Sequence, residues 1–241
     1  MRLNFWLNIL GILILNSVII HAESNIAPFY SHGKGSDKRI TLTFDDGPSK
    51  TTEKLLELLK KKDVKAAFFV LGVNIKRFPL LIKRIHEDGH ELGNHTYGHI
   101  NFGQYKNPDI REKLKQEILS TDEMISEIIG IHPYFVRMPN GTSKSWVKEV
   151  IGELNLSIVN WSFGCDWKKM DLESMSKAYI KAVEPGAVLL FHDTSRNIDE
   201  RLKIIEKVIN YALDNEYVFV TVSEMFELKK AESTAKDLPE K

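Results

Sequence analysis

Short apolar runs rich in Val, Ile and Phe alternate along the chain with longer segments whose apolar residues recur at a helical period. Runs of about four to eight such residues are typical of buried strands, and a period near 3.6 is typical of amphipathic helices. The alternation predicts βα units around a parallel sheet, and therefore the α/β class. The expected strands are Ile40–Phe44, Ala66–Val70, Glu91–Asn94, Tyr134–Arg137, Ser157–Trp161, Ala187–Phe191 and Tyr217–Val220.

Three intervening segments show the helical period most clearly. A leucine face predicts a helix over Thr52–Lys62, and a longer helix is expected from Pro108 to Ile129, where Gly130 ends it. The apolar residues of Leu202–Ala212 predict the last large helix.

The N-terminal residues 1–22 depart from this pattern. A positive charge at Arg2 precedes the apolar stretch Leu3–Ile20, and Ala22 stands at a plausible cleavage point. This order is typical of a signal peptide. An uncleaved membrane anchor is the alternative, since about 18 apolar residues are just long enough to span a bilayer. Either interpretation indicates an exported protein that is secreted, periplasmic or associated with the cell envelope.

The remainder is expected to form one domain. A polar leader, 23–37, precedes a domain over 38–228, within which no repeat or Pro-rich linker marks a boundary. Residues 229–241 are charged and lack an apolar period, which predicts a disordered tail.

Composition excludes several classes of protein. The 241 residues carry 33 Lys+Arg against 33 Asp+Glu, and this balance argues against a nucleic-acid partner, which usually requires a basic excess. An apolar fraction of 43% is too high for a disordered chain. The single cysteine, Cys165, excludes a disulfide framework and a Cys-rich zinc site, and is interpreted as a small buried residue.

Two adjacent carboxylates, Asp45 and Asp46, follow the first expected strand in the run Thr43-Phe44-Asp45-Asp46-Gly47-Pro48. Active sites of βα barrels form at the C-terminal ends of strands, so catalytic groups are expected here. Adjacent acids in one pocket repel each other unless a cation is present; a metal would let one acid ligate while the other acts as a base. A plain turn is the alternative, because Asp-Asp-Gly-Pro is also good loop chemistry.

A pair of histidines follows another expected strand, in His95-Thr96-Tyr97-Gly98-His99. Histidines four residues apart lie on one face of a helical turn and can point at one metal ion. Thr96 stands where a zinc metalloprotease would have Glu, which disfavours that class. Asp46, His95 and His99 would together form a three-ligand site with an open position for water.

A further histidine, His192, ends the hydrophobic run Val188–Phe191. Such a residue is more often structural than catalytic. Near a metal and a carboxylate pair, however, its imidazole could protonate a leaving group.

Taken together these motifs resemble those of the polysaccharide deacetylases, the NodB-homology domain of carbohydrate esterase family four. Five blocks occur in the family's order over about residues 38–225, and so many ordered matches are far more specific than any one motif. They are Thr43-Phe44-Asp45-Asp46-Gly47-Pro48, His95-Thr96-Tyr97-Gly98-His99, Arg137-Met138-Pro139-Asn140-Gly141, Asp166-Trp167 and Leu189-Leu190-Phe191-His192.

The resemblance implies a distorted (β/α)7 barrel, a divalent metal that is usually zinc, with cobalt as a substitute, and hydrolysis of N-acetyl groups on the amino sugars of a glycan such as peptidoglycan or a chitin-like oligomer. By the same resemblance, Asp46, His95 and His99 are the metal ligands. Asp45 is the base that takes a proton from the attacking water, and His192 is the acid that protonates the departing amine.

Supporting roles also follow from the resemblance. Arg137 would orient and stabilise the base, and Asp166 would hold Arg137 or His192 in its working state. Trp167 and Leu189 would wall the acetyl pocket. A backbone N–H near Asn140 could complete an oxyanion site.

The chain departs from the family pattern at two positions. Asn140 stands where the family commonly has Tyr, which alters the subsite surface, and Phe163 stands where a further Asp is common. Both departures affect the tuning of the site and leave the metal ligands, the base and the acid in place.

Two alternatives to a glycan deacetylase remain at this point. The same site could hydrolyse another N-acyl or C–N bond on a small molecule, or the domain could bind a glycan without turnover. The remaining histidines are interpreted as structural or surface residues: His21, His32, His86, His90 and His132. Contact with a membrane is expected only through the N-terminal segment, if that segment is not cleaved.

Overall fold

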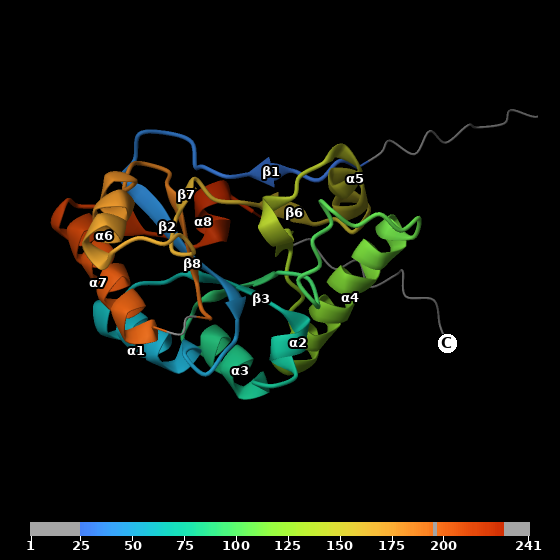
Figure 1. Ribbon diagram of the computed structural model, residues 1–241, viewed down its shortest axis with the longest axis horizontal. Helices are drawn as coiled ribbons and strands as arrows, with labels where there is room; N and C mark the ends of the chain where they lie inside the picture. The colour runs from blue at the N-terminus through green and yellow to red at the C-terminus, as the bar shows by residue number, and fades with distance from the viewer. Residues whose placement is uncertain (1–24, 195–196, 229–241) are drawn as a thin grey trace, which may run out of the picture.

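A curled sheet of parallel strands lies at the centre of the molecule, with helices packed around it (Figure 1). The computed structural model describes residues 25–194 and 197–228. The predicted signal peptide and charged tail lie outside the described residues. The strands are β1 Phe29–Tyr30, β2 Arg39–Gly47, β3 Ala67–Val70, β4 Glu91–Asn94, β5 Phe135–Val136, β6 Ser157–Val159, β7 Phe163–Gly164, β8 Val188–His192 and β9 Val218–Phe219.

The helices follow the strands in the alternation that the sequence predicts. They are α1 Thr52–Lys62, α2 Gly72–Ile75, α3 Pro79–Glu87, α4 Ile110–Ile129, α5 Ser145–Glu153, α6 Leu172–Lys181, α7 Ile198–Asp214 and α8 Val222–Phe226, with a single 3₁₀ turn at Pro139–Gly141. The bounds of α1 are those predicted, and α4 ends at Ile129 because Gly130 adopts the left-handed backbone of a C-cap. No helix among the described residues combines the length and the apolar character needed to cross a membrane.

The sheet is open. Its strands pair in the order β1-β6-β5-β4-β3-β2-β8-β7, and β9 pairs with the start of β2. The path ends at β1 and β7 without pairing between them in the described part of the chain, so the sheet is a curled half-barrel. The predicted α/β class is confirmed. Each of the seven expected strand segments contains an observed strand, while β1 and β7 fall where the pattern predicted none.

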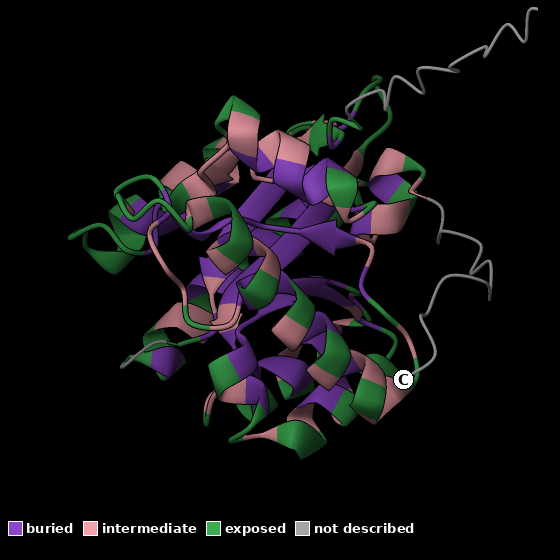
Figure 2. Cartoon of the chain, turned by 90° about the vertical axis from the view of Figure 1, so that its right-hand side faces the viewer, coloured by how far each residue is buried: buried purple, intermediate pink, exposed green. Residues whose placement is uncertain are grey.

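The two faces of the sheet separate the core from the site. On β2 and β8, Leu42 pairs with Leu189 and Phe44 with Phe191, and all four side chains are fully buried against the helices. Figure 2 shows this buried layer between partly exposed helices. Because side chains alternate along a strand, the intervening pairs, Thr43 with Leu190 and Asp45 with His192, face the inside of the curl.

Candidate active site

Three potential metal ligands meet at the C-terminal ends of β2 and β4. One ligand atom each of Asp46, His95 and His99 lies within 4.8 Å of the others. Asp46 Oδ1 lies 3.5 Å from the Nε2 atom of each histidine. That oxygen is buried and has no hydrogen-bond donor among the described residues. Since a buried carboxylate oxygen without a donor is costly, the three atoms fit a divalent cation between them.

The orientation of His95 is fixed by the backbone. Its Nδ1 lies 2.7 Å from the carbonyl oxygen of Arg137. A carbonyl only accepts hydrogen bonds, so Nδ1 carries the proton and Nε2 presents its lone pair to the cluster.

The loop that carries the two histidines is not the helical turn predicted from their spacing. Residues 95–99 form an irregular bend in which Thr96 and His99 have positive φ angles of 69° and 56°. Local hydrogen bonds stabilise this bend: Thr96 N–H donates to Asn94 Oδ1, and Gly98 N–H donates to Glu117 Oε2, each at 2.7 Å. The two imidazoles therefore converge through backbone geometry and not through a helical repeat.

The electrostatics of the cluster favour cation binding. Burial tends to raise the pKa of Asp46, but the proximity of the His95 imidazole, with smaller effects of His192 and His99, outweighs it and lowers the pKa. Burial and then the neighbouring His95 lower the pKa of His99. An anionic carboxylate beside neutral imidazoles is the protonation state in which these groups ligate metals.

Asp45 forms a buried ion pair with Arg137. The Arg137 guanidinium donates to Asp45 Oδ1 at 2.7 Å, and both side chains are almost completely buried. The same guanidinium donates to Thr43 Oγ1 and to the carbonyl oxygens of Val159 and Asn160. Burial lowers the pKa of Arg137, and the charge of Asp45 opposes that shift. The second oxygen of Asp45, Oδ2, lies 3.7 Å from His95 Nε2.

His192 is oriented by Asp166. Its Nδ1 donates to Asp166 Oδ1 at 2.8 Å, and its backbone N–H donates to Asp166 Oδ2 at 2.8 Å. Burial disfavours the imidazolium, but the hydrogen bond and charge of Asp166, with Asp45 and Asp46, outweigh it and raise the pKa of His192. Of the two roles predicted for Asp166, the contact with His192 is the one observed.

An aromatic wall stands beside His192. The Trp167 ring lies edge-on to the imidazole with centroids 5.5 Å apart, and 53% of Trp167 is exposed. A second ring, Trp161, contacts Trp167 edge-on at 6.4 Å.

The prediction that Leu189 walls the acetyl pocket is wrong. Leu189 is fully buried in the cluster between the sheet and the helices, on the face of β8 opposite to His192. Leu190 shares the face of His192, and its Cβ and the Trp167 ring both lie about 3.0 Å from the point where a Cβ on Gly164 would stand. The alternation of side chains along a strand is the signal that identifies Leu190.

The amino-acid sequence is similar to those of known proteins over most of the chain. The family model described as polysaccharide deacetylase matches residues 32–159. A peptidoglycan-N-acetylglucosamine deacetylase of Bacillus cereus (strain ATCC 14579) is 34% identical over 201 residues, which cover 82% of this chain and 72% of the relative. The chain belongs to the polysaccharide deacetylase family.

Two further relatives extend the match. The peptidoglycan-N-acetylmuramic acid deacetylase PdaC of Bacillus subtilis (strain 168) is 33% identical over 198 residues, covering 81% of this chain and 40% of that longer protein. A crystal structure of a peptidoglycan N-acetylglucosamine deacetylase, in complex with 4-naphthalen-1-yl-N-oxidanyl-benzamide, superposes with a TM-score of 0.78 at 33% identity. It covers 85% of this chain and 95% of that one. The predicted class, a hydrolase of the deacetylase type, is confirmed.

In this polysaccharide deacetylase the two departures from the family motifs lie on different sides of the sheet. Asn140 is exposed at the mouth with a positive φ of 57°, and its backbone N–H donates no hydrogen bond to the described residues. Phe163 pairs with Leu189 and packs edge-on against Tyr179, with centroids 5.2 Å apart. Asn140 therefore alters the site surface, whereas Phe163 adds apolar contact on the helix-facing side.

Several residues that position the site were missed by sequence reasoning. Asn74 Nδ2 donates to the Asp46 carbonyl oxygen at 2.7 Å. Glu117, on α4, is buried beneath the histidine loop. Asp193 is fully buried, its N–H donates to the Asp45 carbonyl, and Thr52 Oγ1 donates to its Oδ2 at 2.5 Å. For Asp193 a signal was present, since it directly follows His192; Asn74 and Glu117 lie in segments without a motif.

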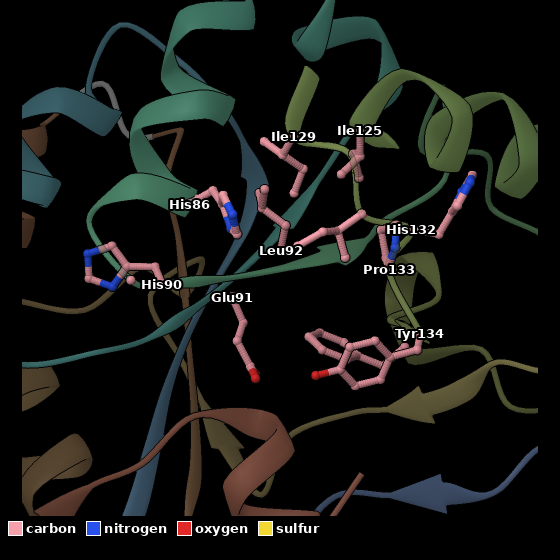
Figure 3. Close-up of a pocket in the computed structure, with 12 residues that line it drawn as sticks. His86, His90, Glu91, Leu92, Ile125, Ile129, His132, Pro133 and Tyr134 are labelled. Atoms are coloured by element: carbon pink, nitrogen blue, oxygen red, sulfur yellow. The ribbon is translucent and has the colours of Figure 1, made fainter. Parts of the chain in front are cut away.

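Three of the other histidines lie at the opposite end of the sheet. His86, His90 and His132 line a cavity of about 320 Å³ at the opposite, N-terminal ends of β4 and β5 (Figure 3). Burial, with Lys65, lowers the pKa of His90 to about 4, and its Nδ1 accepts the Ala66 N–H. This neutral, hydrogen-bonded imidazole agrees with the predicted structural role, as does burial of Cys165.

Proposed function

We propose that this chain is an exported, metal-dependent hydrolase that removes N-acetyl groups from the amino sugars of peptidoglycan. The observation that carries the proposal is the Asp46 Oδ1 atom, which lacks a hydrogen-bond donor and lies between two imidazole nitrogens. The Asp45–Arg137 and His192–Asp166 pairs flank it. A cation site with a carboxylate on one side and an imidazole on the other is what amide hydrolysis requires.

Asp46, His95 and His99 would hold the cation, with zinc as the expected ion and cobalt as a substitute. Two nitrogens and one carboxylate oxygen are a donor set that suits zinc. When bound, such an ion supplies a Lewis acid that makes a water molecule more acidic and polarises the acetyl carbonyl.

Asp45 would accept the proton of the attacking water at Oδ2. Its Oδ1 accepts a hydrogen bond from Arg137, which leaves Oδ2 available. The four hydrogen bonds of the guanidinium hold the base in one orientation. Arg137 therefore acts through Asp45 as a positioning residue.

His192 would deliver the proton that the departing amine nitrogen needs. The hydrogen bond from Nδ1 to Asp166 leaves Nε2 to face the substrate, and the raised pKa favours the imidazolium form that can donate a proton. General acid catalysis of this kind typically contributes ~10²- to 10⁴-fold in rate.

The acetyl group would lie between the catalytic pairs and the aromatic wall. Trp167 and Leu190 offer apolar surface for the methyl group. The free backbone N–H of Asn140 could donate to the oxygen that becomes negative in the tetrahedral intermediate.

Peptidoglycan is favoured over chitin-like oligomers as the substrate, because the Bacillus cereus and Bacillus subtilis relatives described above are both named as peptidoglycan deacetylases. Such a substrate lies outside the cytoplasmic membrane. This agrees with the predicted export segment.

The deciding experiment incubates the zinc-loaded protein with peptidoglycan and with chitin oligomers and follows acetate release and acetyl loss by mass spectrometry. Release from glycan is expected to stop with EDTA, to return with zinc or cobalt, and to be absent in Asp45→Asn. An active Asp45→Asn enzyme would overturn the roles assigned here. Amine release from small amides without release from glycans would favour a different C–N substrate.

A further inference from the structure

A groove of about 680 Å³ lies beside the metal cluster and has no assigned role. It is lined by residues of the β2–α1 loop, of α2 and the turn after it, and by Thr194, two residues beyond His192. Asn74 joins the groove to the cluster, because its side chain both lines the groove and donates to the carbonyl of Asp46. The groove therefore adjoins the loop that carries Asp46.

The groove has a positive charge. Lys50 and Arg77 line it and are exposed, and neither forms an ion pair with a carboxylate of the described residues. None of its described lining residues is acidic. The Arg77 guanidinium lies 5.4 Å from the centroid of the Phe78 ring, a contact that restricts its orientation.

Several other surface cations of this electrically neutral chain are paired with carboxylates. Lys54 contacts Asp199 at 2.8 Å, Lys62 contacts Glu206 at 3.0 Å, and Arg111 contacts Glu149 at 2.9 Å. Lys50 and Arg77 differ from these three in having no such partner among the described residues and in lining one concave surface near the metal cluster, where their charges act together.

We propose that this groove binds a carboxylate on a substituent of the glycan, so that the enzyme prefers carboxylate-bearing strands to neutral ones. The proposal rests on the function proposed above and narrows its substrate class. Chitin oligomers carry no carboxylate, whereas muramic acid carries a lactyl carboxyl and, when substituted, a peptide with carboxylates of its own. A guanidinium with a neighbouring ammonium is suited to recognise such an anion.

The test compares kcat/KM for three substrates: a neutral N-acetylglucosamine tetramer, peptide-free strands of alternating N-acetylglucosamine and N-acetylmuramic acid, and the same strands with peptides. Lys50→Gln, Arg77→Gln and the double variant are compared with Lys177→Gln, which removes an exposed cation of α6 that does not line the groove. The preference for a carboxylate-bearing strand over the tetramer is expected to fall roughly tenfold in the double variant, through KM, and to keep its wild-type value in Lys177→Gln.

A loss shared equally between the neutral and the carboxylate-bearing substrates, or no loss, overturns the proposal. A preference for peptide-free strands identifies the lactyl carboxylate as the ligand, and a preference confined to peptide-bearing strands identifies the peptide. Calorimetric binding of the same strands to Asp45→Asn protein, with and without the two groove substitutions, separates this inference from the proposed function. If no strand is deacetylated but the groove substitutions still weaken binding about tenfold, the function fails and the groove assignment stands.

Discussion

At the scale of single residues, Asp45, His95 and His192 are each held in position by one polar partner. Asp45 has Arg137, His192 has Asp166, and His95 has the carbonyl of Arg137. Because these contacts are separate, a single substitution can remove each one alone. The direction of its effect on activity or on stability can then be predicted.

Asp166→Asn is expected to move the alkaline limb of the kcat/KM profile to lower pH. Burial alone lowers the pKa of His192, and Asp166 is the main group that raises it. Removing that charge lowers the pKa, so the imidazolium needed as acid is lost at a lower pH. The measurement is acetate release across roughly pH 5 to 10, an interval that includes the range of about 5 to 8 in which His ordinarily titrates. An unchanged alkaline limb would show that another group sets it.

Arg137→Met is expected to destabilise the fold by about 3–5 kcal/mol, because it leaves Asp45 buried without its cation. It also removes hydrogen bonds to the Val159 and Asn160 carbonyls. Urea unfolding followed by circular dichroism measures the change. His192→Ala, at a half-buried position, is the matched control and should cost much less; equal costs would contradict the account.

Residue assignments could be predicted from the sequence where a motif fixes the side chain by its position after a strand. Asp46 and His95 come together as predicted, since β2 and β4 flank β3 and end at the same edge. Leu189 was misassigned because the motif alone does not state which face of β8 each residue occupies. Applying the two-residue period of the strand backwards from His192 would have selected Leu190.

At the scale of elements, α4 supports the histidine loop from below. Asn94 Nδ2 donates to Asp122 Oδ1 at 2.6 Å and to the Ile118 carbonyl at 2.9 Å, while its Oδ1 accepts the Thr96 N–H. Burial raises the pKa of Asp122 to about 7, although the hydrogen bond from Asn94 opposes this. At acidic pH the helix therefore contributes Asp122 as an uncharged carboxylic acid. This group contacts Asn94, which in turn hydrogen-bonds to the histidine loop.

Stability is expected to depend on pH through Asp122. Its folded pKa, about 7, lies above the ordinary value of about 3.9 for an unfolded chain, so the native state binds more protons between these values. The contribution is fully present below pH ~4 and is lost as pH rises through ~7, by up to about 4 kcal/mol.

Asp122→Asn should therefore flatten the fall in unfolding free energy between pH 4 and 7 (roughly the interval between the two pKa values). Urea titrations at several pH values test this, with Glu123→Gln on the same helix as the control for removing one charge. A slope that is the same in wild type and Asp122→Asn would contradict the assignment. Asp193, whose pKa burial also raises to about 7, accounts for a residual slope.

Elements were predictable from the sequence in proportion to their length. The eleven residues of α1 present a full leucine face, and both of its bounds were predicted. The two-residue strands β1 and β7 contain too few positions for a period to show, and β1 lies in the segment interpreted as a leader. The spacing of the two histidines does not predict the loop between them, because the side chains of the neighbouring Asn94 and the distant Glu117 stabilise its irregular backbone.

At the scale of the whole molecule, residues 25–37, which precede the predicted domain start at residue 38, belong to the folded unit. Phe29 and Tyr30 pair with Ile158 and Val159 of β6, and Ala27 N–H donates to the Lys148 carbonyl. Gly152 of α5 is packed so closely against Asn25 and Ala27 that a Cβ there would overlap with the backbone. This segment covers one edge of the half-barrel.

A protein that begins at Lys38 is expected to unfold at a lower temperature than one that begins at Asn25. Losing the β1–β6 pairing and the burial of Ala27 exposes both β6 and the apolar face of α5. A decrease in Tm of several degrees is expected for a loss of about 2 kcal/mol or more. Differential scanning calorimetry of the two proteins makes the comparison; equal Tm values would show that the leader is dispensable.

The position of Arg137 has a consequence for which residues can be lost when a protein of this kind loses its activity during evolution. Its guanidinium joins β2, β5 and β6 inside the curl, so the residue serves the architecture as much as the reaction. His192, by contrast, is half-buried at the rim, and the surrounding fold does not depend on its ring. A lineage that loses the histidine would retain a folded glycan-binding protein, whereas one that loses the arginine would lose the protein. Inactive descendants of this chain should therefore keep Arg137 after His192 has been replaced by another residue.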